Sequence, residues 1–186
     1  SLRVLGKLNE ATESFRKAIA LKSDCAEAHA NLGITLQEMG RLEEAEAALR
    51  QAILSKPNFA ESHRNLGNVL RGQDKLEEAA NSYNQAITLK LDFAEAHSDL
   101  GIALQEMGRL EEAVNSYNQA IIFKPDFAGA HSNLGVVLQE LGRLEESEAN
   151  CRLAITLKPE YAEAHYNLGN TLKELNRLDE AIENYS

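Results

Sequence analysis

The five histidines of this chain are spaced at equal intervals of 34 residues. The same interval separates five leucines that each precede a glycine, beginning with Leu32 and Gly33. A fixed interval of roughly 20–50 residues is typical of repeat architectures, in which similar units stack side by side. The 186 residues therefore predict an array of repeats and not a domain with one central core. The histidines are His29, His63, His97, His131 and His165.

Each repeat contains two stretches with helical periodicity. Small and apolar residues recur at steps of three and four along residues 26–36 and again along residues 42–53, which predicts two amphipathic helices. Gly40 stands between them, where the first helix ends and a left-handed backbone conformation is needed. We therefore expect two antiparallel helices per repeat. The same turn position holds Gly6, Asp74, Gly108, Gly142 and Asn176.

The junctions between repeats carry a lysine that is usually followed by a proline. The lysine offsets the negative end of the second helix, and the proline stops that helix. Leu91 replaces this proline at one junction and Gly129 replaces a glutamate after another, which predicts two slightly looser junctions. The prolines are Pro57, Pro125 and Pro159. After the junctions, three pairs of residues are expected to cap the start of the next helix as capping boxes: Asp24 with Glu27, Asn58 with Glu61, and Asp92 with Glu95.

The charge balance excludes several classes of partner. The chain has 19 Lys+Arg against 29 Asp+Glu, a formal charge of −10, with no basic cluster. Nucleic acids and anionic membranes are therefore unexpected partners. No apolar run approaches the roughly 18 residues that span a bilayer, and Cys25 and Cys151 cannot build a disulfide framework. We expect a soluble, cytoplasmic protein.

The residues that invite a chemical role all have structural explanations. Histidines one repeat apart cannot converge on a metal ion, so we expect half-buried packing residues with locally hydrogen-bonded rings. The Glu-Glu pair that opens each second helix complements the positive helix end. Cys151 stands where other repeats have Tyr83 and Tyr117, as a small apolar filler. No serine, cysteine or threonine lies in a glycine-flanked elbow and no carboxylate pair is unique to one place, so we expect no enzyme activity, metal or cofactor.

The combined pattern resembles the tetratricopeptide repeat family. It reads His-x2-Leu-Gly-x2-Leu, then Ala, then Tyr or Phe, then Ala and Pro, with His where family members often have an aromatic residue. The resemblance implies an all-α, right-handed superhelical solenoid whose first helices line a concave groove. It covers the whole chain as a single solenoid: a partial repeat at 1–25, complete repeats at 26–59, 60–93, 94–127 and 128–161, and a partial repeat at 162–186.

One polar column recurs two residues after each histidine. An asparagine amide can pair with both the N–H and the C=O of an extended peptide without reading its sequence. The column is similar to the asparagine ladder in the repeat domain of O-linked N-acetylglucosamine transferases. Alternatively, these side chains bond to neighbouring backbone or to each other. The column consists of Asn31, Asn65, Asp99, Asn133 and Asn167.

Residues expected beside this column would set selectivity. Positively charged residues lie at 64–71 and again at Lys173, and acidic residues such as Asp99 lie between these two positions in the sequence. We therefore expect a ligand with an acidic group near Arg64 and Arg71 and a basic group near Asp99. Arg64 and Asn68 begin the clamp for C-terminal carboxylates known in the family, but the next repeat does not continue it. The predicted flanking residues are Arg64, Asn68, Arg71, Tyr166, Asn170 and Lys173, opposite Gln37, Glu38, Gln105, Glu106, Gln139 and Glu140.

These features predict a protein-interaction scaffold that binds an extended peptide in its groove. Two alternatives stay open at this point: the chain is the substrate-recruiting arm of a larger enzyme such as a glycosyltransferase, or it self-associates end to end. Because both ends fall inside a repeat, we expect a piece of a longer array.

Overall fold

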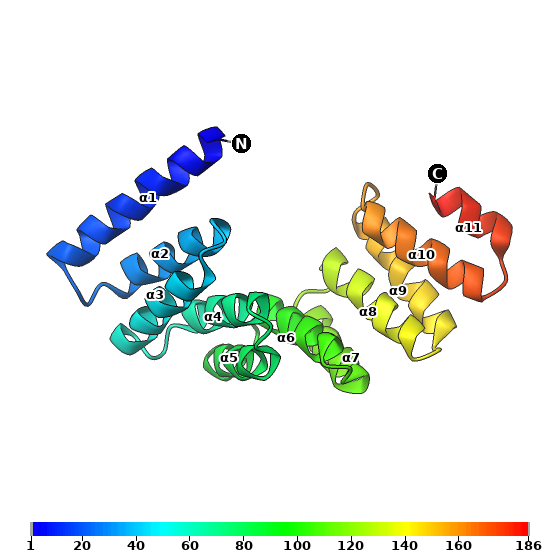
Figure 1. Ribbon diagram of the computed structural model, residues 1–186. Coiled ribbons are helices and arrows are strands. Elements are labelled where there is room, and N and C mark those ends of the chain that lie inside the picture. The colour runs from blue at the N-terminus through cyan, green and yellow to red at the C-terminus, as the bar shows by residue number, and fades with distance from the viewer. Residues whose placement is uncertain (1, 186) are drawn as a thin grey trace. The chain divides into compact units, whose positions relative to one another are not determined.

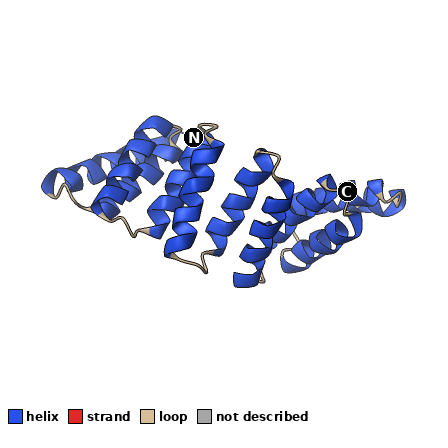
Figure 2. Cartoon of the chain, turned by 90° about the horizontal axis from the view of Figure 1, so that it is seen from below, coloured by secondary structure: helices blue, strands red, loops and turns tan. Residues whose placement is uncertain are grey.

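The computed structural model describes residues 2–185, with side chains from 6 to 184, and every regular element in this part of the chain is a helix (Figures 1 and 2). Helix α1 spans Leu2–Leu21. The first helices of the repeats are α2 (Ala26–Glu38), α4 (Ala60–Gly72), α6 (Ala94–Glu106), α8 (Ala128–Glu140) and α10 (Ala162–Glu174). The second helices are α3 (Leu42–Ser55), α5 (Leu76–Leu89), α7 (Leu110–Phe123), α9 (Leu144–Leu157) and α11 (Leu178–Tyr185).

The two helices of each repeat pack against each other, which confirms the predicted all-α hairpins. The glycine that follows each of the leucines spaced 34 residues apart lets the second helix of the repeat approach closely. A Cβ atom added at Gly101 would lie 2.7 Å from a ring carbon of Tyr117, whose side chain is fully buried. Gly67 and Tyr83 form the equivalent pair in the preceding repeat. In these two repeats the hairpin core is therefore built on contact between glycine and an aromatic ring, whereas Gly33 faces Leu49 and Gly135 faces Cys151.

The turns between paired helices have the predicted left-handed residue. Gly40, Gly108 and Gly142 have φ of +73° to +74°, and Asp74 and Asn176 have φ of +61°. The first turn shows the hydrogen bonds that such a residue permits. The Arg41 N–H donates to the Leu36 carbonyl over 2.9 Å, and the Gly40 N–H donates to the Gln37 carbonyl over 2.9 Å.

The prediction for Gly6 is wrong, because α1 runs through this residue without a turn. A continuous helix keeps the backbone hydrogen bonds that a turn at residue 6 would break. The outermost residues of the two predicted partial repeats, Ser1 and Ser186, lie outside the described residues.

The predicted capping boxes are also wrong. Helices α2, α4 and α6 have Cys25, Phe59 and Phe93 at the N-cap, and none of these residues makes a side-chain capping bond. Asp24, Asn58 and Asp92 therefore lie one position too early, outside the helix. The glutamates pair with the lysines that end the second helices instead: Lys56 Nζ lies 3.2 Å from Glu27, and Lys124 Nζ lies 2.9 Å from Glu95.

An aromatic ring beneath each of these lysines explains why the N-cap is not polar. The ammonium group of Lys124 lies 4.8 Å from the centre of the Phe127 ring, and that of Lys158 lies 4.6 Å from the Tyr161 ring. The same arrangement joins Lys56 and Phe59 at 4.5 Å. At these three junctions a lysine therefore lies over an aromatic N-cap residue, whereas the N-cap of α2 is Cys25.

The chain forms two compact units, the N-terminal unit Ser1–Leu91 and the C-terminal unit Asp92–Ser186. Within the N-terminal unit α3 packs on α4, and within the C-terminal unit α7 packs on α8 and α9 on α10. Successive first helices also touch within a unit, α2 with α4, α6 with α8, and α8 with α10. Each unit therefore presents a surface made by its first helices, which we call its first-helix face.

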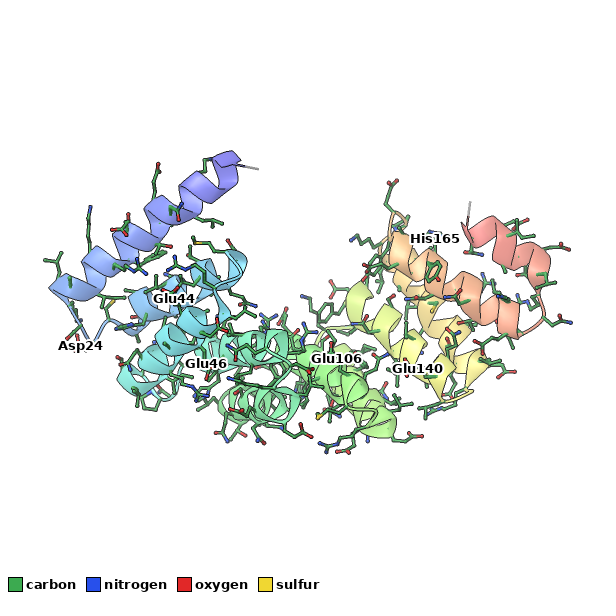
Figure 3. All side chains as sticks on the ribbon, in the orientation of Figure 1. Asp24, Glu44, Glu46, Glu106, Glu140 and His165 are labelled. Atoms are coloured by element: carbon green, nitrogen blue, oxygen red, sulfur yellow. The ribbon has the colours of Figure 1, made fainter. Side chains whose placement is uncertain are left out.

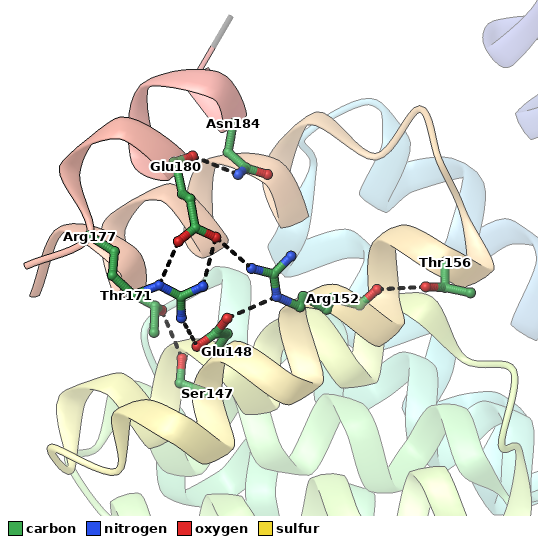
Figure 4. A network of polar contacts seen from close by, with 8 residues as sticks. All are labelled: Ser147, Glu148, Arg152, Thr156, Thr171, Arg177, Glu180 and Asn184. Atoms are coloured by element: carbon green, nitrogen blue, oxygen red, sulfur yellow. Dashed lines mark hydrogen bonds and ion pairs between the residues drawn. The ribbon is translucent and has the colours of Figure 1, made fainter. Parts of the chain in front are cut away.

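An ion network links repeats on the other side of the C-terminal unit (Figure 4). The carboxylate of Glu148 on α9 accepts bonds from Arg152 over 2.9 Å and from Arg177, before α11, over 2.7 Å. Arg177 also holds Glu180 with two bonds of 2.7 and 2.6 Å. Glu46 makes the equivalent contacts in the N-terminal unit, where it projects from α3 (Figure 3).

Candidate functional site

The histidine column is structural, as predicted. Nε2 of His29 lies 3.0 Å from the carbonyl oxygen of Ser23, six residues earlier, and three other histidines repeat this bond at 2.9–3.1 Å. His97 is buried and stacks on Phe123 with ring centres 5.4 Å apart. In each bond to a carbonyl the ring N–H donates. These imidazoles therefore orient the junctions between repeats.

The two cysteines lie in different environments. Cys151 is fully buried opposite Gly135, and burial raises the pKa of its thiol to about 11. A protonated, buried thiol packs as a small apolar group, as the sequence predicts. Cys25 is half-buried at the start of α2. Among the described residues, no group of three His, Cys, Asp or Glu side chains could hold a metal ion.

The glutamate pairs open the second helices, as predicted. Both members lie in the first turn, and in α3, α7 and α9 the second member is held by the arginine that precedes the helix. Lys75 precedes α5 and pairs with Glu46 instead. Arg143 donates to Glu146 over 2.8 and 2.7 Å, and these hydrogen bonds lower the pKa of the Glu146 carboxyl. The pairs therefore complete the turn and are not a calcium site.

The polar column lies along the first helices with its side chains at least partly exposed. Asn31 is exposed, and the other four members are half-buried. In the part of the chain that the structure describes, the amides of Asn31, Asn65 and Asn133 make no hydrogen bond. Asn167 differs, because its Nδ2 donates to Ser132 Oγ over 3.1 Å and so links α10 to α8. Asn167 thus bonds to a neighbouring repeat, which was the alternative interpretation of the column. The amides of Asn31, Asn65 and Asn133 form no such bond in the described structure.

Two members of the column share a hollow on the C-terminal unit. This hollow of about 530 Å³ lies between α8 and α10, and Tyr166 beside it is 60% exposed. Sequence reasoning missed the contribution of Glu163, although its position four residues before Asn167 places both on one helical face. We call this the α8–α10 hollow. Its lining is Ser132, Asn133, Ala162, Glu163, Tyr166 and Asn167.

A second hollow of about 850 Å³ lies between α10 and α11. It brings together the three predicted residues of α10, namely Tyr166, Asn170 and Lys173. Glu183 and Asn184 complete it from α11, and sequence reasoning did not identify them. Tyr166 therefore borders both hollows.

In the N-terminal unit the predicted flanking residues lie on α4. Arg64, Asn68 and Arg71 are all half-buried. The Tyr83 hydroxyl donates to Asn68 Oδ1 over 2.8 Å, so this amide is partly engaged inside its own hairpin. The sequence did not indicate this bond, because it depends on how the two helices of the repeat are rotated.

Glutamine and glutamate side chains connect neighbouring first helices of the C-terminal unit. Gln105 Nε2 donates to Glu140 over 2.6 Å, and Gln139 Nε2 donates to Glu174 over 2.5 Å. Glu140 projects from α8 (Figure 3). The predicted residues Gln105 and Glu140 thus bond to each other, and the predicted Gln139 bonds to Glu174, which was not predicted.

No helix within the described residues is long and apolar enough to cross a membrane.

Comparisons with known proteins agree with this architecture. Family models described as TPR repeat match residues 67–108 and 106–142, and models described as tetratricopeptide repeat match residues 5–66 and 126–186. No curated protein sequence matches the chain.

Several solved structures share the fold. YrrB, described as a TPR protein with an unusual peptide-binding site, is 23% identical with a TM-score of 0.74 over 93% of this chain and 89% of its own. MamA from Desulfovibrio magneticus RS-1 is 21% identical with a TM-score of 0.77, over 86% and 90%. PilF from Pseudomonas aeruginosa is 22% identical with a TM-score of 0.80, over 86% and 73%. With family models matching from residue 5 to residue 186, the chain belongs to the tetratricopeptide repeat family.

Proposed function

We propose that the chain is a protein-interaction module, without catalytic activity of its own, that binds an extended peptide segment of a partner along its first-helix faces. The observation that carries this proposal is the α8–α10 hollow, where the unused amide of Asn133 and the amide of Asn167 lie beside the exposed ring of Tyr166. Amide groups next to an exposed aromatic ring are typical of peptide-binding surfaces.

The chemistry of the column suits a peptide backbone. Each amide offers an acceptor and two donors, and a residue of an extended chain offers one N–H and one C=O. Such bonds hold the backbone whatever the side chains are, so they give affinity with little selectivity. Asn31 and Asn65 supply equivalent amides on the N-terminal unit.

Selectivity then depends on the flanking residues. Arg64 and Arg71 favour an acidic group of the ligand at the N-terminal unit, and Asp99 favours a basic group at the C-terminal unit. Asn170 and Lys173, in the α10–α11 hollow, extend the proposed site. The similarity in fold to YrrB supports this proposal, since that protein is described as having a peptide-binding site.

The experiment is a selection of short random peptides displayed on phage, carried out on the purified chain. The test variant changes Asn31, Asn65 and Asn133 to Ala. The matched control changes Asn81, Asn115 and Asn118 to Ala, three exposed asparagines of the second helices that also make no side-chain hydrogen bond in the described structure. Both variants remove the same atoms from helices.

We expect the test variant to recover at least about tenfold fewer phage than the original chain, because several hydrogen bonds of about 1 kcal/mol each are lost. The control variant should recover as many as the original chain. Circular dichroism on all three proteins checks that the helices persist. Equal recovery by the test variant and the original chain would contradict the proposal and place binding on another surface.

A further inference from the structure

The negative charge of this protein is confined to one of its two compact units. The N-terminal unit has 12 Lys+Arg and 12 Asp+Glu, so its formal charge is zero. The C-terminal unit has 7 Lys+Arg against 17 Asp+Glu, so it carries the whole net charge of −10. A surface with such an excess attracts cationic ligands and repels anionic ones.

The cations of the C-terminal unit are already engaged away from its first-helix face. Five of the seven form ion pairs with carboxylates at the turns, the junctions and the second helices, and Lys158 lies over the Tyr161 ring. In contrast, the first helices α6, α8 and α10 carry six acidic residues, of which Glu95 is the partner of Lys124, and one cation, Lys173. The first-helix face of this unit is therefore acidic.

Glu163 places one of these carboxylates in the α8–α10 hollow. It is exposed, and no ion pair involves it in the part of the chain that the structure describes. The pKa of the neighbouring Tyr161 phenol is raised, first by burial and then by a hydrogen bond with Glu163. Lys173 lines the α10–α11 hollow and not this one. An anionic ligand group in the α8–α10 hollow would meet Glu163 without a compensating cation.

The remaining groups of the hollow suit a long cationic side chain. Tyr166 exposes 60% of its surface, and an aromatic face attracts ammonium and guanidinium groups. The methylene groups of lysine or arginine can cover the ring while the charged end reaches a carboxylate. The amides of Asn133 and Asn167 lie in the same hollow. Asn133 makes no side-chain hydrogen bond in the described structure, and Asn167 keeps its carbonyl oxygen as an acceptor while its Nδ2 donates to Ser132.

We propose that the α8–α10 hollow binds a lysine or arginine side chain of the peptide, with its charge between the Tyr166 ring and the Glu163 carboxylate. This inference rests on the proposed function, and it adds to the basic group expected near Asp99 a second basic position at Glu163, a residue that the sequence analysis did not select. The ligand is thus a peptide segment with a basic residue where it crosses α8 and α10.

The test uses the same phage selection but reads the composition of the recovered peptides. The variants are Glu163→Gln and Tyr166→Leu, which remove the charge and the aromatic face while keeping similar size. The control is Glu145→Gln, which makes the same charge change at an exposed position in the first turn of α9. Circular dichroism again verifies folding. A synthetic recovered peptide and its copy with Gln in place of the basic residue are then compared by fluorescence anisotropy.

In the original chain and the control we expect Lys and Arg to be enriched over Asp and Glu, and the Gln copy to bind at least about threefold more weakly. In Glu163→Gln and Tyr166→Leu this preference should fall to near unity while peptides are still recovered. Recovery of peptides with the same basic preference in all four proteins would overturn the assignment, as would enrichment of acidic residues. If the original chain recovers no peptides at all, the proposed function itself fails.

Discussion

Single residues determine how closely the helices of a repeat approach. Gly101 lies against the fully buried ring of Tyr117, and the equivalent glycine of another repeat lies against Cys151. Sequence analysis identified the Leu-Gly spacing and the buried position of Cys151, because both follow from helical periodicity. It could not identify the bond between Tyr83 and Asn68, which depends on the three-dimensional rotation of two helices.

The contact at Gly101 predicts that Gly101→Ala lowers the free energy of unfolding. The new methyl group would lie 2.7 Å from a ring carbon of Tyr117, so the packed core must shift at a cost of about 1–3 kcal/mol. The control is Gly72→Ala at the end of α4, where the nearest contact is 3.4 Å from a flexible leucine carbon, and it should change stability little. Urea unfolding followed by circular dichroism measures both. Equal stability of the two variants would contradict the packing argument.

At the scale of helices and turns, the sequence predicted the pairs of helices and most of the turns that join the two helices of a repeat. The left-handed residues at Gly40, Asp74 and Asn176 were predicted because few residue types tolerate that conformation. The turn at Gly6 was predicted wrongly, because a local residue preference cannot show whether a partner helix is present. The capping boxes failed because the N-cap position is taken by a residue such as Phe59, whose ring supports a lysine.

Gly108 and Gly6 occupy the same position of the repeat, but Gly108 forms a left-handed turn and Gly6 lies within a helix. Replacing each glycine by alanine should therefore have opposite effects on stability. Gly108→Ala places a methyl group on a residue with φ of +74° and should destabilise the protein by about 1–2 kcal/mol. Gly6→Ala replaces a glycine within α1, where a Cβ atom meets nothing within 4 Å, and should increase helix stability by about 0.5–1 kcal/mol. Thermal unfolding and helical content measure both. Destabilisation by Gly6→Ala would indicate that residue 6 forms a turn.

The ion network between α9 and the last hairpin makes stability depend on pH. Burial raises the pKa of Glu148, but hydrogen bonds from Arg152 and Arg177 outweigh it, so the pKa lies below its ordinary value of 4.5. A lowered folded-state pKa means that the network stabilises the protein above pH 4.5 and loses this effect as the pH falls through the folded-state value.

Glu148→Gln should therefore lower the free energy of unfolding by about 1 kcal/mol at neutral pH, and the difference from the original chain should shrink as the pH falls. Glu145→Gln, which changes the same charge at an exposed position, serves as the control. Denaturant unfolding at a series of pH values gives the comparison. A difference that stays constant in acid would show that the Glu148 carboxylate contributes through packing and not through charge.

Across the whole molecule, the repeats build the first-helix faces. Residues that differ between repeats would determine which peptides these faces select. The polar column recurs in every repeat as Asn or, at position 99, as Asp. The acidic excess is confined to residues 92–186, and the exposed Tyr166 lies on α10. Helical periodicity in the sequence placed the column and its proposed flanking residues on the first helices, where the structure has them. It did not predict which of them share a hollow, since the α8–α10 hollow combines side chains from two repeats.

The most direct test of the account is a proton–nitrogen correlation spectrum of the side-chain amides. Single Asn→Ala variants assign the signals of Asn31, Asn65 and Asn133 on the first helices and of Asn81, Asn115 and Asn118 on the second helices. A peptide recovered by phage selection is then added. We predict that the first three signals shift and the last three do not, because the column bonds to the peptide backbone. Shifts confined to the second-helix amides would contradict binding on the first-helix faces.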